Sequence, residues 1–309
     1  MKKALITGIT GFVGNHLKDF LEVRGEYEVY GITSNTSRVR NNIFYANLTD
    51  FQALKNILSQ IKPDEIYHLG ALASPKESFD APLMYHQVNY LGTLNLYEAI
   101  KEVKFSPNIL FVSSSEVYGS PSQNDLPLTE KSPIHPESPY AASKAAAEII
   151  SQQYNKTEKL NIKIARPFNH FGTGQDEKFV LSSFTRQITE IIKKNTTPVI
   201  YTGNLSAKRD FTNVNDVVRA YHSIQISGKT GETYNICTGK SCKIEECLNI
   251  LRSFADKEIE VKKDKNRLRK SDIEDYFGSY EKLNKITGWK PEISLEKGLK
   301  ELFNYYLES

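Results

Sequence analysis

The sequence predicts an α/β fold, a doubly wound parallel sheet that carries a smaller, interleaved C-terminal α/β domain. The first half of the chain alternates short apolar runs with amphipathic stretches, a glycine-rich turn follows the first apolar run, and the second half is less regular. Alternating strands and helices are typical of a parallel sheet covered by helices on both faces. Glycines between the first strand and the first helix are typical of Rossmann-type sheets. We therefore predict a Rossmann-type core.

Six short apolar runs in the first half predict strands at 3–7, 28–32, 43–46, 65–69, 109–112 and 162–165. Helices are predicted to begin near Phe12, Asp50, Ala81 and Pro139. The second half predicts helices at 180–194, 214–226 and 295–307, strands at 198–201 and 232–237, and a charged loop at 261–275. We predict a Rossmann domain over residues 1–166 plus about 212–236, and a second domain over 167–211 and 237–309.

The composition is that of a globular protein without a strong overall charge. The 309 residues are 39% hydrophobic, and 40 basic against 37 acidic residues give a formal net charge of +3. This balance argues against a nucleic-acid partner, and no apolar run approaches the roughly 18 residues of a membrane span. We therefore expect a cytoplasmic protein without a membrane partner. Cys237, Cys242 and Cys247 lack CxxC spacing and a nearby histidine, so they predict ordinary thiols and no metal site.

The segment Thr7-Gly-Ile-Thr-Gly-Phe-Val-Gly14 is the glycine-rich turn. Gly8 and Gly11 let the backbone approach a pyrophosphate, and Gly14 lets the following helix pack close to the sheet. The first amides of that helix then face the phosphates. The turn therefore predicts a bound dinucleotide.

The residues after the second strand bear on which dinucleotide is bound. An acidic residue there would bind the adenosine ribose hydroxyls and favour NAD. This chain has no carboxylate there and instead carries hydroxyls, Asn35 and the cationic Arg38, a set that can accept a 2′-phosphate. We predict NADP(H), with NAD(H) open because Arg38 could equally be a solvated loop residue.

A tyrosine and a lysine four residues apart, Tyr140 and Lys144, share one face of a predicted helix. A phenol with a pKa of about 10 is a poor acid or base at neutral pH. We expect the Lys144 ammonium to lower the pKa of Tyr140 and to hydrogen-bond the nicotinamide ribose. The pair predicts redox chemistry in which a phenol transfers the proton.

Three serines and a glutamate follow the fifth strand, at the edge of a parallel sheet where catalytic groups collect. Ser114 or Ser115 can donate to a carbonyl oxygen as it gains negative charge. Glu116 is either an acid–base carboxylate or a structural acceptor for the loop.

With these motifs in order, the chain resembles the extended short-chain dehydrogenase/reductase family. The segments are TGITGFVG, HLGALAS, VNYLGT, SSSEVYG and YAASK. Within that family it is most similar to the reductases that convert GDP-4-keto-6-deoxy-D-mannose to GDP-D-rhamnose. That likeness rests on RPFNHFGTGQ (166–175), GNLSAKRDF (203–211), RLR (267–269) and TGWKP (287–291).

The resemblance implies a role for each matching residue. In catalysis, Ser114 would orient the substrate, Tyr140 would donate the proton, and Lys144 would adjust the pKa of Tyr140. The implied cofactor-binding residues are Gly8, Thr10, Gly11, Phe12, Val13, Leu69, Gly70, Ala71, Pro167 and His170, beside Tyr140 and Lys144. The implied substrate-binding residues are Asn169, Val180, Arg209 and Arg269, beside Ser114, Ser115 and Glu116.

Two positions depart from the family pattern. Asn47-Leu48 stands where Asp-Leu often holds adenine, and an amide oxygen can still accept from the adenine amine. Lys270 stands where a proline is usual, which leaves the substrate less defined.

The activity that the resemblance implies is NADPH-dependent reduction of the C4 ketone of a nucleotide-linked 4-keto-6-deoxy sugar. The substrate would be GDP-4-keto-6-deoxy-D-mannose and the product GDP-D-rhamnose or its C4 epimer. Two alternative activities remain. One is a GDP-mannose-type 4,6-dehydratase that uses Glu116, and the other is a reductase or epimerase that acts on a TDP- or CDP-sugar. An NADP-sensing regulator is disfavoured, because such proteins tend to lose the Tyr–Lys pair. The second domain would bind the nucleotide sugar, and the family implies a homodimer through a four-helix bundle of helices within 81–104 and 139–156.

Overall fold

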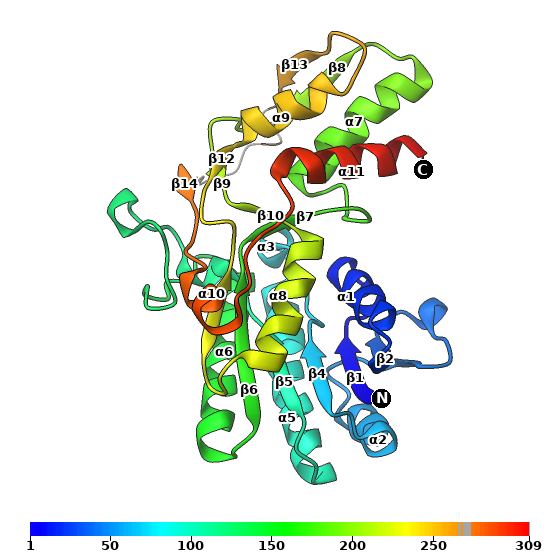
Figure 1. The fold of residues 1–309 in the computed structure, drawn as a ribbon, viewed down its shortest axis with the longest axis vertical. Coiled ribbons are helices and arrows are strands. Elements are labelled where there is room, and N and C mark those ends of the chain that lie inside the picture. The colour runs from blue at the N-terminus through cyan, green and yellow to red at the C-terminus, as the bar shows by residue number, and fades with distance from the viewer. Residues whose placement is uncertain (265–266, 268–272, 309) are drawn as a thin grey trace.

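The structure is a computed structural model that describes residues 1–264, 267 and 273–308. Its centre is a parallel sheet of seven strands in the order β11-β6-β5-β4-β1-β2-β3, which occupies the lower half of Figure 1. The strands are β1 (Lys2–Thr7), β2 (Tyr27–Thr33), β3 (Ile43–Tyr45), β4 (Glu65–His68), β5 (Asn108–Val112), β6 (Asn161–Pro167) and β11 (Thr233–Ile236). The strand order reverses between β1 and β4, which is where ligands bind in open α/β sheets.

Helices cover both faces of the sheet, which confirms the doubly wound prediction. One face carries α2 (Phe51–Ile61), α5 (Gly92–Val103) and α6 (Pro139–Thr157), and the other carries α1 (Phe12–Val23), α8 (Val214–Ser227) and α10 (Glu281–Thr287). Neighbouring residues of one strand face opposite layers, so Leu5 joins the first core and Ile6 joins the second. Because both faces are covered, the strands read as continuous apolar runs.

The rest of the chain forms a smaller α/β lobe, drawn above the sheet in Figure 1. Its helices α7 (Val180–Lys194), α9 (Ile244–Ser253) and α11 (Leu295–Glu308) enclose a separate apolar core. Its parallel pair is β8 (Val199–Thr202) with β13 (Glu260–Lys263). A three-stranded sheet joins β12 (Cys242–Lys243), β9 (Lys208–Arg209) and β14 (Asp275–Tyr276), and β7 (Asn169–Phe171) pairs with β10 (Phe211–Asn213).

Two local expectations differ from the structure. The segment 261–275 is not a loop throughout, because residues 260–263 form β13 and residues 275–276 form β14. The helix expected to begin near Ala81 consists of α4 (Pro82–Tyr85), a π-helical turn η2 (His86–Leu91) and then α5. The domain boundaries stay a prediction. Across the described ranges, no helix combines the length and the apolar character that crossing a membrane requires.

Candidate active site

The glycine turn after β1 has a backbone conformation that larger residues rarely adopt and leaves little room for a side chain. Gly8 has a φ of +72°, and a Cβ placed on it would lie 3.0 Å from the Cα of Gly70 in the loop after β4. A Cβ on Gly14 would lie 2.2 Å from the carbonyl oxygen of Gly8. The turn is therefore packed against both the first turn of α1 and the loop after β4. This backbone cradle fits a dinucleotide pyrophosphate.

The other end of the predicted cofactor site lies after β2 and β3. Thr10 and Thr33 share a hydrogen bond of 2.8 Å between their hydroxyl oxygens. The Asn35 side-chain oxygen accepts from the amide and the hydroxyl of Ser37, so it holds the turn that carries Arg38. Arg38 is exposed, as an arginine must be to reach a phosphate on a bound nucleotide.

Of the two residues predicted to hold adenine, one is buried and one is exposed. Leu48 is buried, and it packs so closely on α5 that a Cβ on Gly92 would lie 2.6 Å from the Leu48 Cβ. Asn47 is exposed, and its amide nitrogen donates to the Tyr45 hydroxyl.

A buried hydrogen-bond relay holds the loop after β4, which carries Leu69, Gly70 and Ala71. The Gly70 amide donates to the Thr7 hydroxyl over 2.9 Å, and that hydroxyl lies 2.7 Å from Nδ1 of His68. His68 Nε2 lies 3.0 Å from the Thr93 hydroxyl, which donates to the carbonyl of Asn89. Burial, with a smaller effect of the Lys144 charge, lowers the pKa of His68 to about 3. A neutral ring that accepts at Nδ1 and donates at Nε2 satisfies every bond of this relay.

Asn89, in the π-helical turn, connects the loop after β4 to the helix that carries the proton-transfer pair. Its side chain accepts from the amide of Leu72, and its nitrogen donates to the Leu72 carbonyl and to the Ser143 hydroxyl at 2.9 Å. Ser143 lies on α6 between Tyr140 and Lys144. Asn89 lies in the VNYLGT motif, but no role for it could be predicted, because irregular π turns leave no clear periodic signal.

Tyr140 and Lys144 lie on α6 as predicted, and both are buried. Burial raises the pKa of Tyr140 to about 12, the hydrogen bond to Ser114 lowers it, and the charge of Glu116 raises it. The expectation that Lys144 lowers this pKa is wrong for this structure: burial raises the pKa of Tyr140, and the one group that lowers it is Ser114. Burial lowers the pKa of Lys144 to about 7, against the opposing effect of Glu148. The phenol is thus protonated at neutral pH and can act as an acid.

Ser114, Ser115 and Glu116 lie where β5 ends, as predicted, with Ser114 capping the short helix η3 (Ser115–Tyr118). The Ser114 hydroxyl oxygen accepts from the Glu116 amide over 3.2 Å. This bond does not use the hydroxyl proton of Ser114, which can be donated to another acceptor. The backbone carbonyl of Ser115 accepts from the hydroxyl of Tyr276, which comes from β14 in the smaller lobe. The Glu116 charge raises the pKa of both Tyr140 and Tyr276, so the carboxylate lies close enough to act on the two phenols electrostatically.

A buried ion pair lies one turn beyond Lys144. Glu148 is fully buried and forms a bidentate pair with Arg166, whose Nε donates to Oε2 over 3.1 Å. Arg166 also donates to the Tyr118 hydroxyl over 2.9 Å, and Tyr118 donates to the side-chain oxygen of Asn235 over 2.7 Å. The sequence pattern does not predict this network. Its one signal in the sequence is a glutamate four residues after Lys144, a spacing that surface helices also show.

The residues after β6 connect the two parts of the molecule. Pro167 ends β6, and Asn169 and His170 are half-buried in β7. The His170 ring stacks on the ring of Phe12, with centroids 6.1 Å apart and planes within 6°. This contact joins the first turn of α1, which also carries Val13, to the segment predicted to flank the nicotinamide.

The predicted substrate residues come from the smaller lobe. Val180 begins α7, and Arg209 lies on β9, where its guanidinium donates to the carbonyls of Lys208 and Ile273, each over 2.7 Å. Its strand neighbour Asp210 is buried and accepts from Thr238 and Gly239, which fixes this part of the chain. Arg269 lies outside the described residues.

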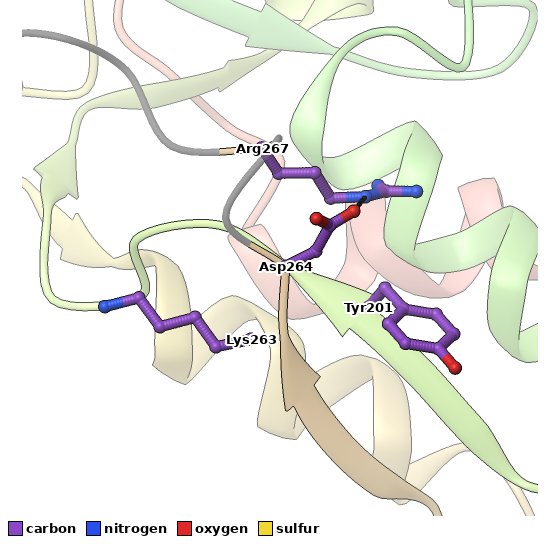
Figure 2. A pocket seen from close by; sticks show the side chains of 4 residues that line it. All are labelled: Tyr201, Lys263, Asp264 and Arg267. Carbon is purple, nitrogen blue, oxygen red and sulfur yellow. Dashed lines mark ion pairs between the residues drawn. The ribbon is translucent and has the colours of Figure 1, made fainter.

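A cavity of about 630 Å³ opens where β8 and β13 end, lined by Tyr201, Lys263, Asp264 and Arg267. In Figure 2 the Tyr201 ring and the Arg267 guanidinium extend to the same side, whereas Lys263 points away from both. Arg267 Nε lies 3.6 Å from Oδ2 of Asp264, and its terminal nitrogen donates to the Ser183 hydroxyl. An aromatic face beside a carboxylate and a guanidinium can stack with and hydrogen-bond a nucleobase. Tyr201 and Asp264 were not among the predicted site residues, because neither lies in a recognisable motif.

Comparisons with known proteins agree with this geometry. The family model described as GDP-mannose 4,6 dehydratase matches residues 5–302. The chain is 34% identical to GDP-6-deoxy-D-mannose reductase of Pseudomonas aeruginosa over 98% of this chain and 96% of that protein. It is 31% identical to GDP-mannose 4,6 dehydratase 2 of Caenorhabditis elegans over 97% of this chain and 88% of that protein. A solved structure of RMD from Pseudomonas aeruginosa complexed with NADPH has a TM-score of 0.90, 33% identity and 100% coverage of both chains.

Proposed function

The chain belongs to the GDP-mannose 4,6-dehydratase family, and from that premise we propose that it is an NADPH-dependent 4-ketoreductase. Its substrate is a GDP-linked 4-keto-6-deoxy sugar, most specifically GDP-4-keto-6-deoxy-D-mannose, and its product is GDP-D-rhamnose or the C4 epimer. The Pseudomonas aeruginosa reductase and the RMD structure complexed with NADPH support this choice of reaction and cofactor. NAD(H) is the alternative cofactor.

The observation that carries the proposal is the contact between the Tyr140 phenol and the Ser114 hydroxyl at the end of β5. When bound, NADPH supplies the hydride that reduces the C4 ketone. Tyr140 donates its phenolic proton to the ketone oxygen as that oxygen gains negative charge, and Ser114 donates a hydrogen bond to the same oxygen. Protonated Lys144, one helical turn away, then stabilises the phenolate.

The cofactor and the nucleotide sugar would be held by different parts of the chain. The glycine turn, Arg38 and the loop carrying Gly70 would hold NADPH, whereas Arg209 would bind the diphosphate of the sugar nucleotide. In the cavity of Figure 2, the Tyr201 ring would stack on the base, and Asp264 would accept from the N–H groups on the edge of guanine.

The test is to mix the purified protein and NADPH with GDP-4-keto-6-deoxy-mannose and to follow the absorbance of reduced nicotinamide. We expect stoichiometric loss of that absorbance and a GDP-deoxyhexose whose C4 configuration NMR identifies. TDP- and CDP-linked 4-keto sugars are the matched substrates that test which nucleobase the protein prefers. No oxidation of NADPH with any of the three would contradict the proposed reduction.

A GDP-mannose 4,6-dehydratase is the second candidate, because Glu116 follows Ser114 closely in the chain and its charge acts on the Tyr140 phenol. That reaction oxidises C4, removes the C5 proton and expels water from C6, and Glu116 would supply the required carboxylate. A 4-keto sugar formed from GDP-mannose and oxidised cofactor, and abolished by Glu116→Gln, would favour this candidate over the reductase.

We also propose a homodimer located in the cytoplasm. Support for the dimer comes from large apolar side chains that are exposed on the helices predicted to form it: Leu83, Met84, Leu91 and Ile149. Sedimentation of the wild type against a Leu83→Lys/Ile149→Lys variant tests this. We expect a dimer and a monomer respectively, because two buried charges oppose association.

A further inference from the structure

Two cysteines five residues apart in the sequence meet at the edge of the three-stranded sheet. Cys242 lies on β12 and is partly exposed, and Cys247 lies in the first turns of α9 and is buried. Their sulfur atoms are 3.6 Å apart. A disulfide bond of about 2.0 Å therefore requires only a small rotation of both side chains. The third cysteine, Cys237, is buried in another core cluster.

The same sheet connects this thiol pair to the proposed substrate site. Cys242 pairs with Arg209 across the β12–β9 ladder, and Tyr276 pairs with Arg209 from the other side. The Tyr276 hydroxyl donates to the backbone carbonyl of Ser115 next to the catalytic serine. A change in the position of β12 therefore acts directly on the strand that carries Arg209.

We propose that Cys242 and Cys247 form a peroxide-sensitive thiol pair whose oxidation to an intrachain disulfide weakens nucleotide binding at Arg209. The part concerning Arg209 rests on the proposed function, whereas the oxidation itself does not. Cys242 is the attacking residue because it is the more exposed of the two, and buried Cys247 is the resolving residue.

The reaction proceeds in two balanced steps. The Cys242 thiolate attacks hydrogen peroxide, the O–O bond breaks, and a sulfenic acid forms while hydroxide leaves and takes up a proton as water. The Cys247 sulfur then attacks the Cys242 sulfur, the S–O bond breaks, and a second water leaves. Two thiols are oxidised by two electrons, and one peroxide is reduced to two waters.

One neighbouring group restrains this reaction. The Cys242 thiol donates to a carboxylate oxygen of Glu246 over 3.1 Å, and this hydrogen bond has to break before the sulfur can attack. Because the thiolate is the species that attacks peroxide, the oxidation is tested at about pH 8.5, where ordinary thiols are partly ionised.

The test treats the full chain with millimolar peroxide at about pH 8.5, followed by mass spectrometry and by calorimetric titration with GDP. We expect a loss of 2 Da in the peptide that contains both cysteines, an unmodified Cys237, and an affinity for GDP about threefold lower that a dithiol reductant restores. Cys242→Ser and Cys247→Ala are the matched controls, and each should show neither the 2 Da loss nor the reversible change in affinity.

Each other outcome overturns a specific part of the proposal. Oxygen adducts on Cys242 without the 2 Da loss would show that the two sulfurs do not react with each other. A disulfide with unchanged GDP affinity would overturn the link to Arg209. A reduced protein that does not bind GDP would count against the proposed substrate, while the mass measurement would still decide whether the pair oxidises.

Discussion

The proposed cofactor site and the proposed substrate site are formed by different kinds of groups. The cofactor side uses backbone and buried groups: glycines in contact with one another, and the relay through Thr7, His68 and Thr93. The substrate side uses half-buried or exposed side chains, such as Arg209 and Tyr201, which extend from short strands. Packing therefore fixes the residues of the proposed chemistry, whereas the proposed substrate contacts come from side chains that can change without disturbing a core.

Substitutions of the buried residues in and around the proposed cofactor site should have the largest effects on activity and stability. The largest is expected at Tyr140. Tyr140→Phe removes only the proton donor, so we expect kcat to fall about 10³-fold while NADPH affinity stays within about twofold. Steady-state assays and fluorescence titration measure the two quantities. Tyr85→Phe is the matched control, because its ring lies edge-on to Tyr140 at 6.3 Å. An equal loss of activity in both variants would assign the effect to packing.

The Glu148–Arg166 pair should dominate stability on the same side. Glu148→Gln leaves Arg166 buried without its charge partner, and we expect the free energy of unfolding to fall by about 3 kcal/mol. Urea denaturation measures this. The half-exposed pair Lys55–Glu102 is the matched control, and Glu102→Gln should cost under about 1 kcal/mol. Equal losses would mean that burial does not distinguish the two pairs.

The buried His68 makes the free energy of unfolding depend on pH. Its folded-state pKa of about 3 lies below the ordinary 6.5, so the neutral ring contributes stability that is present above pH 6.5 and is lost as the pH falls toward 3. Between pH 7.5 and 5.0 this one group should remove about 2 kcal/mol. His68→Gln should lower stability at both pH values but flatten this dependence by about the same amount. An unchanged dependence in the variant would mean that His68 does not titrate in this range.

The sequence predicted the buried, regular elements of the fold best. Buried strands such as β1 and β5 leave continuous apolar runs, so their places were predicted to within a residue or two. Tyr140 and Ser114 were predicted together because both follow from motif position on a regular scaffold, and the structure brings them into contact.

What the sequence could not predict depends on contacts between distant residues. A two-residue strand such as β9 is too short for a periodic pattern, so it exists only through its partners β12 and β14. The raised pKa of Tyr140 depends on burial by surrounding elements, which helical spacing does not report. The meeting of Cys242 and Cys247 likewise depends on how β12 turns into α9.

On the substrate side, Arg209 should show a moderate effect that is confined to binding. Arg209→Ala should raise KM for the nucleotide sugar about tenfold and change kcat less than about twofold, because a lost diphosphate contact weakens ground-state and transition-state binding equally. Steady-state assays with varied nucleotide sugar measure both. Lys208→Ala on the same strand, whose side chain pairs with Asp275, should stay within about twofold. A fall in kcat at Arg209 would assign it to the chemistry instead.

The smallest effect should come from Arg38, which belongs to the cofactor site but is exposed as the substrate residues are. Arg38→Ala should raise KM for NADPH about fivefold, as expected for one exposed contact to a phosphate, and leave KM for NADH unchanged. Arg40→Ala, in the same loop, is the matched control and should affect neither cofactor. Equal effects of Arg38→Ala on both cofactors would mean that Arg38 does not read the 2′-phosphate, and NADP selection would then belong to the hydroxyls around Asn35.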